Sequence, residues 1–251
     1  MKNPIIFTLP RTGSTVVCKL LGNIARQEFG HKNVLYEYFN INFIDSVHNN
    51  KQLDYKQVHV FDDKIIVALQ GERTHESDSE VRKRRLELLQ HNPRHTMKVF
   101  PSVMTSDIVS FIIKEYDFIF LERRDKIEQF LSFCSILHSR KTHFLKDDQT
   151  NITSFPFVLS RVQWFANQLQ MFNDMQKKKP GITVYYEDFM NLGGDQKALA
   201  KLLGLTGTNL IDCNVLTKPT PYEDTYENLI SNKAEWLEHK QFVIDTFSKY
   251  D

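Results

Sequence analysis

The hydrophobic and polar positions along this chain follow two patterns, one typical of buried strands and one typical of amphipathic helices. Short runs rich in β-branched and aromatic residues indicate strands that are covered on both faces of a sheet. Segments with apolar residues three and four positions apart indicate helices between them. The pattern predicts strands at 5–9, 97–100, 117–121 and 182–186, with a further strand or its approach at 34–39. Helices are predicted at about 16–29, 78–90, 106–114, 157–178, 196–203 and 234–250, and from the turn at 122–125 to about 139.

Strands that alternate with helices predict an α/β fold, a three-layer sandwich with a central parallel sheet. Parallel sheets of this kind bind ligands beyond the carboxyl ends of their strands. The turns at 10–15 and 123–126, together with the turn after Met97, should therefore share one face. Residues 40–76 are the least readable part, and a hairpin at 58–69 is one interpretation.

Composition and charge place the chain among ordinary globular proteins. With 251 residues, 41% of them hydrophobic and 25% charged, it has enough apolar material for one large domain spanning 1–251. A net charge of +1 argues against a nucleic-acid partner. No apolar stretch approaches the roughly 20 residues that span a bilayer, so no integral membrane segment is expected.

The cysteine and histidine patterns bear on compartment and metal. Cys18, Cys134 and Cys213 are odd in number and far apart, which excludes a disulfide framework and favours a reducing, cytoplasmic location. The nine histidines form no HExxH motif, so no metal site is expected.

The loop after the first predicted strand carries the strongest chemical signal. It reads Pro-Arg-Thr-Gly-Ser-Thr over residues 10–15 and opens a helix, so its N–H groups and hydroxyls could face an anion. Arg11 could add a charged contact. The loop is P-loop-like, but it lacks the GxxxxGK[ST] spacing of a Walker A motif. The alternative is an ordinary helix start that Ser14 or Thr15 caps.

A second signal lies at the end of the strand at 117–121. Arg123, Arg124 and Asp125 follow that strand, and Ser132 stands eight residues after Arg124. Arg124 and Ser132 could converge on one phosphate. The alternative is a solvated charge cluster in which Asp125 caps the helix. The basic run at 82–85 is interpreted as a solvated helix face.

Taken together, PRTGST and LxRRDxxxxxxS resemble the sulfotransferase family, whose donor is 3′-phosphoadenosine 5′-phosphosulfate (PAPS). TVYYEDF at 183–189 and the KLLGL helix end are also typical of that family. The resemblance implies a sulfotransferase fold, which is P-loop NTPase-like. It implies a 5′-phosphosulfate site made by Arg11, Thr12, Gly13, Ser14 and Thr15. It also implies a 3′-phosphate site made by Arg124 and Ser132.

Glu37 is the candidate base. It lies in the sequence LYEYF at 35–39, which is similar to the bacterial trehalose-sulfotransferase branch of the family. That resemblance implies that Glu37 deprotonates the acceptor hydroxyl. The alternative is a surface glutamate beside two core aromatic residues.

Two lysines are further candidates. Lys98 lies in MKVFP, where many cytosolic sulfotransferases carry a lysine followed two residues later by a catalytic histidine, and this chain has Phe100 at that position. Lys98 could contact the sulfuryl group or simply end a strand. The resemblance places Lys218, in TKPTPY, where family members close over the nucleotide, and a solvated loop lysine is the alternative.

The resemblance implies transfer of a sulfuryl group from PAPS to an acceptor hydroxyl, with PAP as product and no metal. A carbohydrate or glycolipid acceptor is expected, and the unmatched regions 40–95 and 140–156 are expected to select it. Two alternatives stay open. One is a protein of this fold that binds a nucleotide or partner without turnover, and the other is a P-loop kinase or NTPase.

Overall fold

A parallel sheet forms the centre of the protein in the computed structural model, which describes residues 1, 3–31, 33–35, 37–40, 77–91, 93–139, 154–205 and 226–250. Its five strands are β1 (Pro4–Thr8), β2 (Asn33–Leu35), β3 (His95–Val99), β4 (Asp117–Glu122) and β5 (Ile182–Tyr185). They lie in the order β2-β3-β1-β4-β5, and every pairing is parallel. The predicted parallel α/β sheet is confirmed.

Each central strand divides its side chains between two hydrophobic layers, because successive residues of a strand point to opposite faces. On β4, Phe118 and Phe120 join one core, while Ile119 and Leu121 join the other. All four side chains are buried. The continuous apolar run that predicted a strand covered on both faces is thereby explained.

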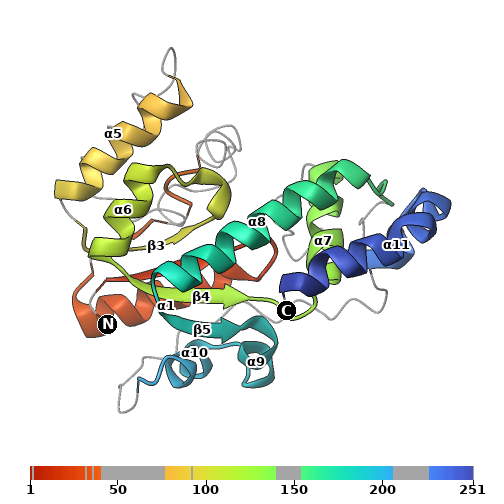
Figure 1. The fold of residues 1–251 in the computed structure, drawn as a ribbon. Helices are drawn as coiled ribbons and strands as arrows, with labels where there is room; N and C mark the ends of the chain where they lie inside the picture. The colour runs from red at the N-terminus through yellow and green to blue at the C-terminus, as the bar shows by residue number, and fades with distance from the viewer. Residues whose placement is uncertain are drawn as a thin grey trace.

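Helices complete a three-layer sandwich (Figure 1). The helix α1 (Ser14–Phe29) packs with α10 (Gln196–Leu202) against one face of the sheet. The opposite face is covered by α6 (Ser106–Glu115) and α8 (Leu159–Lys178). The ring of Phe172 on α8 stacks on Phe7 of β1, with centroids 5.6 Å apart.

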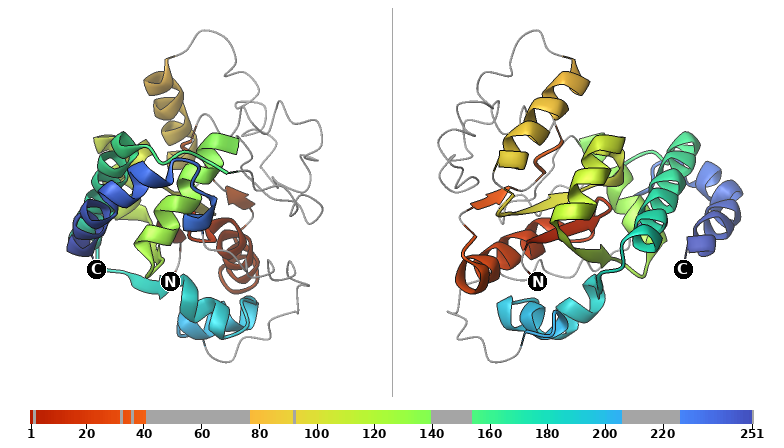
Figure 2. Two further views of the ribbon diagram at one scale, coloured as in Figure 1. Left: turned by 90° about the vertical axis from the view of Figure 1, so that its right-hand side faces the viewer. Right: turned by 60° about the vertical axis from the view of Figure 1, so that its left-hand side comes forward.

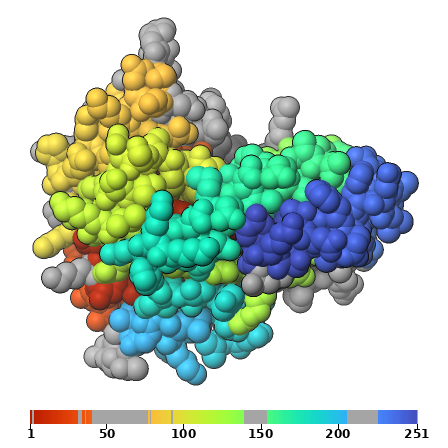
Figure 3. Space-filling view, in the orientation of Figure 1, coloured from red at the N-terminus to blue at the C-terminus, as the bar shows by residue number. Residues whose placement is uncertain are grey.

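The C-terminal part of the chain extends the layer that contains α8. Here α7 (Lys126–Ser139) and α11 (Lys233–Phe247) pack with α8. The two further views show this group beside the sheet (Figure 2). In the space-filling view, α8 and α11 lie side by side on the near face (Figure 3). The short helix η3 (Tyr226–Leu229) contacts α7 and brings the C-terminal segment close to the carboxyl end of β1.

The predicted helix ends are confirmed where their caps can be seen. Ser77 and Glu80 form the capping box of α5 (Asp78–His91), with the Ser77 N–H donating to Glu80 Oε2 at 2.7 Å. Thr105 caps α6 by accepting from the N–H of Ile108. Gly30 ends α1 with a left-handed φ of 66°. Among the described helices, none is both long and apolar enough to span a bilayer.

Two expectations are corrected, and three fall outside the described residues. The run at 82–85 is not a wholly solvated face, because Arg85 is buried and donates to the carbonyl of Tyr38 at 2.6 Å. A short helix, α9 (Tyr186–Asn191), follows β5 directly where none was expected. The hairpin at 58–69, residues 140–153 of the expected acceptor region 140–156, and Lys218 lie outside the described residues.

Candidate functional site

The loop between β1 and α1 is held in shape by hydroxyl groups. Thr8 and Thr12 share a hydrogen bond of 2.6 Å, and Thr8 donates to the carbonyl of Leu121 on β4 at 2.8 Å. The Thr12 hydroxyl also lies 3.1 Å from the carbonyl oxygen of Leu9, so its one hydrogen is shared between Thr8 and Leu9. Both threonines are buried. The Thr12 hydroxyl is therefore committed to the loop itself, and only its backbone N–H can serve an anion.

The backbone of this loop leaves its N–H groups without acceptors among the described residues. Arg11 and Gly13 both take left-handed conformations, with φ of 68° and 70°. Within the part of the chain that the structure describes, the N–H groups of residues 11–15 donate no hydrogen bond. Gly13 is the N-cap of α1 and no side chain caps it, so the alternative of a helix capped by Ser14 or Thr15 is wrong. Free N–H groups at a helix start form an anion-binding cradle.

Gly13 is required at this turn for two reasons. Its positive φ is unfavourable for residues with a Cβ. In addition, a Cβ at this position would overlap the ring of Tyr186, the first residue of α9. The unexpected helix after β5 thus forms one wall of the loop.

Arg11 is a partly buried cation without a carboxylate partner among the described residues. Its Nε donates to Ser132 Oγ on α7 at 3.1 Å. Burial lowers the pKa of the Arg11 guanidinium, and a hydrogen bond with Tyr226 opposes that effect. The charge of Arg123 lowers the pKa further, so two guanidinium groups face the same region. A partly desolvated positive charge of this kind favours an anionic ligand.

Lys98 joins the loop to the candidate base. It is 2% exposed, and its Nζ lies 2.8 Å from both Thr15 Oγ1 and Glu37 Oε1. An ammonium group carries three donors, and these two contacts use two of them. Because Thr15 is in the first turn of α1, the Lys98 ammonium lies next to the anion-binding cradle.

The carboxylate of Glu37 is oriented on both oxygens. Lys98 donates to Oε1, and the Asn40 side-chain amide donates to Oε2 at 2.7 Å. The side chain is 12% exposed, so a small part of it remains accessible. Each carboxylate oxygen has two lone-pair sites and uses one of them within the described residues. Glu37 is therefore largely buried and not a plain surface glutamate, and lone pairs remain that could accept a proton.

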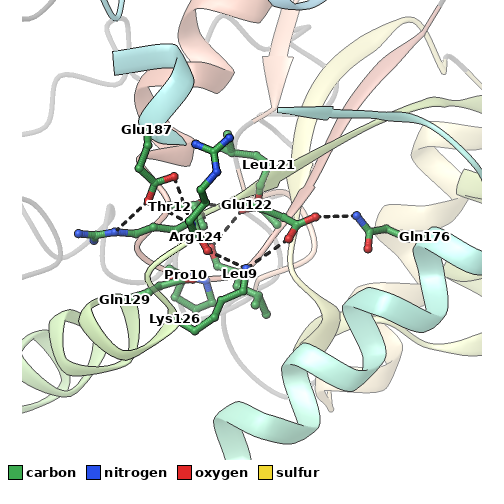
Figure 4. Close-up of polar contacts among 12 residues, drawn as sticks. Leu9, Pro10, Thr12, Leu121, Glu122, Arg124, Lys126, Gln129, Gln176 and Glu187 are labelled. Carbon is green, nitrogen blue, oxygen red and sulfur yellow. Dashed lines mark hydrogen bonds and ion pairs between the residues drawn. The ribbon is translucent and has the colours of Figure 1, made fainter. Parts of the chain in front are cut away.

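Arg124 lies at the same edge of the sheet but faces another partner. Its guanidinium makes two hydrogen bonds to the Asp188 carboxylate and lies 4.2 Å from the ring centre of Tyr185. Its backbone N–H donates to Glu187 (Figure 4). Within the described residues no hydrogen bond joins Arg124 to Ser132, which instead contacts Arg11. The structure therefore brings Arg11 and Ser132 together, and Arg124 flanks them.

The start of α7 is held by charged contacts that build the site rather than bind a ligand. Lys126 is nearly buried and donates to Glu122 and to the carbonyl of Arg123, while Gln176 donates to Glu122 (Figure 4). Asp125 accepts from the N–H of Glu128 at 2.8 Å, as the cap alternative proposed. These contacts determine where Ser132 lies.

Sequence reasoning did not identify several residues that complete the site. Gln129 donates to the carbonyl of Pro10 at 2.7 Å and ties α7 to the loop. Asn40, Tyr186 and Asp188 were likewise missed. The YYED run at 185–188 is part of the family resemblance. Its position at the end of a predicted strand is the signal that could have placed Tyr186 and Asp188 at the site. Among the described residues, no group of His, Cys, Asp and Glu side chains could hold a metal ion.

Comparison with known proteins adds one similarity. No model of a known protein family matches the chain, and no curated protein matches it. A solved structure that is similar is the crystal structure of retinol dehydratase in complex with androsterone and inactive cofactor PAP. The identity is 14% and the TM-score is 0.38, over 95% of this chain and 65% of that chain. This chain thus spans just under two thirds of the length of that protein.

Proposed function

We propose that this protein is a PAPS-dependent sulfotransferase. The observation that carries the proposal is Arg11, a partly buried guanidinium that donates to Ser132 and has no carboxylate partner among the described residues. It lies beside a row of backbone N–H groups with no acceptor in the described chain. An anion with several charged oxygens would satisfy these donors together.

The donor would be held from both of its phosphate ends. The loop residues Arg11 to Thr15 would bind the 5′-phosphosulfate, whose sulfuryl group is what PAPS supplies when bound. Arg124 and Ser132 would bind the 3′-phosphate, as the family resemblance implies. Lys218 is proposed to close over the nucleotide. Support for the 5′ part of this assignment comes from Arg11, Lys98 and Thr15, whose cations and hydroxyl lie near the carboxyl ends of β1 and β3.

Glu37 would act as the base. Its Oε atoms, held by Lys98 and Asn40, would take the proton of the acceptor hydroxyl while that oxygen attacks sulfur. The bond between sulfur and the bridging phosphate oxygen breaks, and PAP leaves with the electron pair. Lys98 and Arg11 would stabilise the negative charge that develops on the sulfuryl and phosphate oxygens. One such donor contributes about 3 to 4 kcal/mol in other enzymes.

The acceptor is proposed to be a hydroxyl of a carbohydrate or glycolipid, by resemblance to the trehalose-sulfotransferase branch. The regions 40–95 and 140–156 are proposed to select it. A protein that binds nucleotide without turnover and a P-loop kinase are the competing functions. The missing Walker A lysine disfavours the kinase.

A binding and turnover experiment separates these functions. Thermal unfolding is followed with PAP, with PAPS and with ATP plus magnesium, and labelled PAPS is then incubated with sugars and glycolipids. We expect PAP and PAPS to raise the midpoint and label to appear in a sugar ester. Stabilisation by ATP plus magnesium alone contradicts the proposal. Binding of PAP without transfer to any acceptor supports the non-catalytic alternative.

A further inference from the structure

The ion pair between Arg124 and Asp188 occupies the part of Arg124 that a phosphate would use. Nη1 donates to Oδ1 at 2.8 Å, and Nη2 donates to Oδ2 at 2.7 Å. Arginine recognises carboxylate and phosphate with the same fork of parallel N–H groups. Asp188 therefore imitates two oxygens of a phosphate, and both cannot be bound by this fork at once.

The ion pair is exposed to solvent, so the Arg124 guanidinium can exchange Asp188 for another anion. Arg124 is 50% exposed and Asp188 is 41% exposed, and ion pairs in such positions contribute little to stability. Meanwhile Arg124 is held by its backbone N–H to Glu187 and by its position over the ring of Tyr185. These contacts keep the residue at the site while its guanidinium changes partner.

We propose that Asp188 is an internal competitor of the 3′-phosphate for Arg124, and that it sets the affinity for the nucleotide product. The inference rests on the proposed function. When PAP binds, phosphate replaces the Asp188 carboxylate on Arg124, and when PAP leaves, the ion pair forms again. A nucleotide held by several cations dissociates slowly, so a competing carboxylate speeds its release.

The test measures PAP binding to Asp188→Asn, a variant that keeps the side-chain shape and removes its charge. We expect the dissociation constant of PAP to fall about two- to five-fold, the range that an exposed pair allows, through slower dissociation. Binding of adenosine 5′-phosphate, which has no 3′-phosphate, should not change. Titration calorimetry gives the constants and stopped-flow displacement gives the rates.

Two control variants isolate the competition. In an Arg124→Ala background, Asp188→Asn should have no effect on PAP, because there is no guanidinium to compete for. Glu115→Gln removes a charge from the exposed Lys114 pair on α6 and should leave PAP binding unchanged. Thermal unfolding without ligand shows whether each variant is folded.

The outcomes separate this inference from the proposed function. If the unmodified protein binds PAP and Asp188→Asn binds it equally or more weakly, the competition is refuted and Asp188 only positions Arg124. A tighter affinity that persists in the Arg124→Ala background also refutes it, because general charge repulsion then explains the change. If no variant binds PAP, the proposed function fails and the inference fails with it.

Discussion

At the scale of single residues, the ion pair between Lys98 and Glu37 has a role in stability and a proposed role in catalysis. The two side chains are 2% and 12% exposed, so both charges have lost most of their water. Removal of one partner from a buried ion pair leaves an uncompensated charge. The pair therefore stabilises the protein only as a unit, although its proposed catalytic roles are separate.

A double-mutant cycle measures this interdependence. Within the described residues, Lys98→Met leaves the Glu37 carboxylate with one hydrogen bond, from Asn40. It should lower the free energy of unfolding by about 3 to 5 kcal/mol. Addition of Glu37→Gln should restore part of the loss, because the uncompensated charge is then gone. Urea unfolding of the four proteins gives the coupling. Additive losses would show that the two charges do not depend on each other.

Glu37→Gln also tests the proposed base. The amide keeps the size of the side chain and can accept a hydrogen bond from Lys98, but it cannot take up a proton. Affinity for PAP should remain within a few-fold of the original, whereas turnover should fall about 10²- to 10⁴-fold. Calorimetry with PAP and initial rates with labelled PAPS provide the two readouts. Turnover that survives the substitution would place the base elsewhere.

The residue types of the site could be predicted from the sequence, but their pairing could not. The spacing of eight residues suggested that Arg124 and Ser132 converge, yet Arg124 precedes α7 and its partner Asp188 comes 64 positions later. Ser132 faces Arg11, which is 121 positions away. Spacing restricts positions within one helix, whereas these contacts depend on how α7 and α9 pack beside β1.

At the scale of elements, the turn from β1 into α1 depends on one glycine. Gly13→Ala should destabilise more than Gly30→Ala at the other end of the same helix. Both positions have a positive φ, of 70° and 66°, which costs an alanine about 1 to 2 kcal/mol. Only at Gly13 would the new Cβ overlap the Tyr186 ring, which should cost about 1 to 3 kcal/mol more.

Chemical unfolding of the two variants measures this difference. A Tyr186→Ala background serves as the control, because it removes the ring and should also remove the excess cost at Gly13. PAP binding should weaken for Gly13→Ala and not for Gly30→Ala. Equal losses of stability at both glycines would mean that α9 does not press on the loop.

The elements themselves were largely predictable. The strands β1, β3, β4 and β5 showed as short runs rich in apolar residues, although β5 lies at the edge of the sheet and only its Val184 is buried. The helix α1 showed as an apolar stripe that ends at Gly30. The exception is α9, whose six residues are too few for a periodic pattern. Short helices are held by their packing, here against β5, and local sequence does not reveal them.

At the scale of the whole molecule, two buried cysteine thiols lie in the hydrophobic cores on opposite faces of the sheet. Cys18 on α1 belongs to the core on one face of the sheet, and Cys134 on α7 belongs to the core on the other face. Both are fully buried. Burial raises the pKa of Cys18 to about 12 and that of Cys134 to about 11. Because the unfolded thiols ionise near 9, the protein should lose stability as the pH rises from about 9 to about 12.

Alkylation of these thiols tests whether the chain is one cooperative domain, as its length and composition predict. A buried thiol reacts only after the structure opens, since the reagent needs an exposed thiolate. PAP at 100 times its dissociation constant should stabilise the folded state by about 2.7 kcal/mol and slow opening-dependent reaction about 100-fold. If the chain is one cooperative unit, PAP should slow the alkylation of both cysteines equally, although neither is proposed to contact the nucleotide. Peptide-resolved mass spectrometry follows each thiol at a pH below 9. Protection of Cys18 without protection of Cys134 would show that the two layers open independently and that PAP stabilises only the layer of α1.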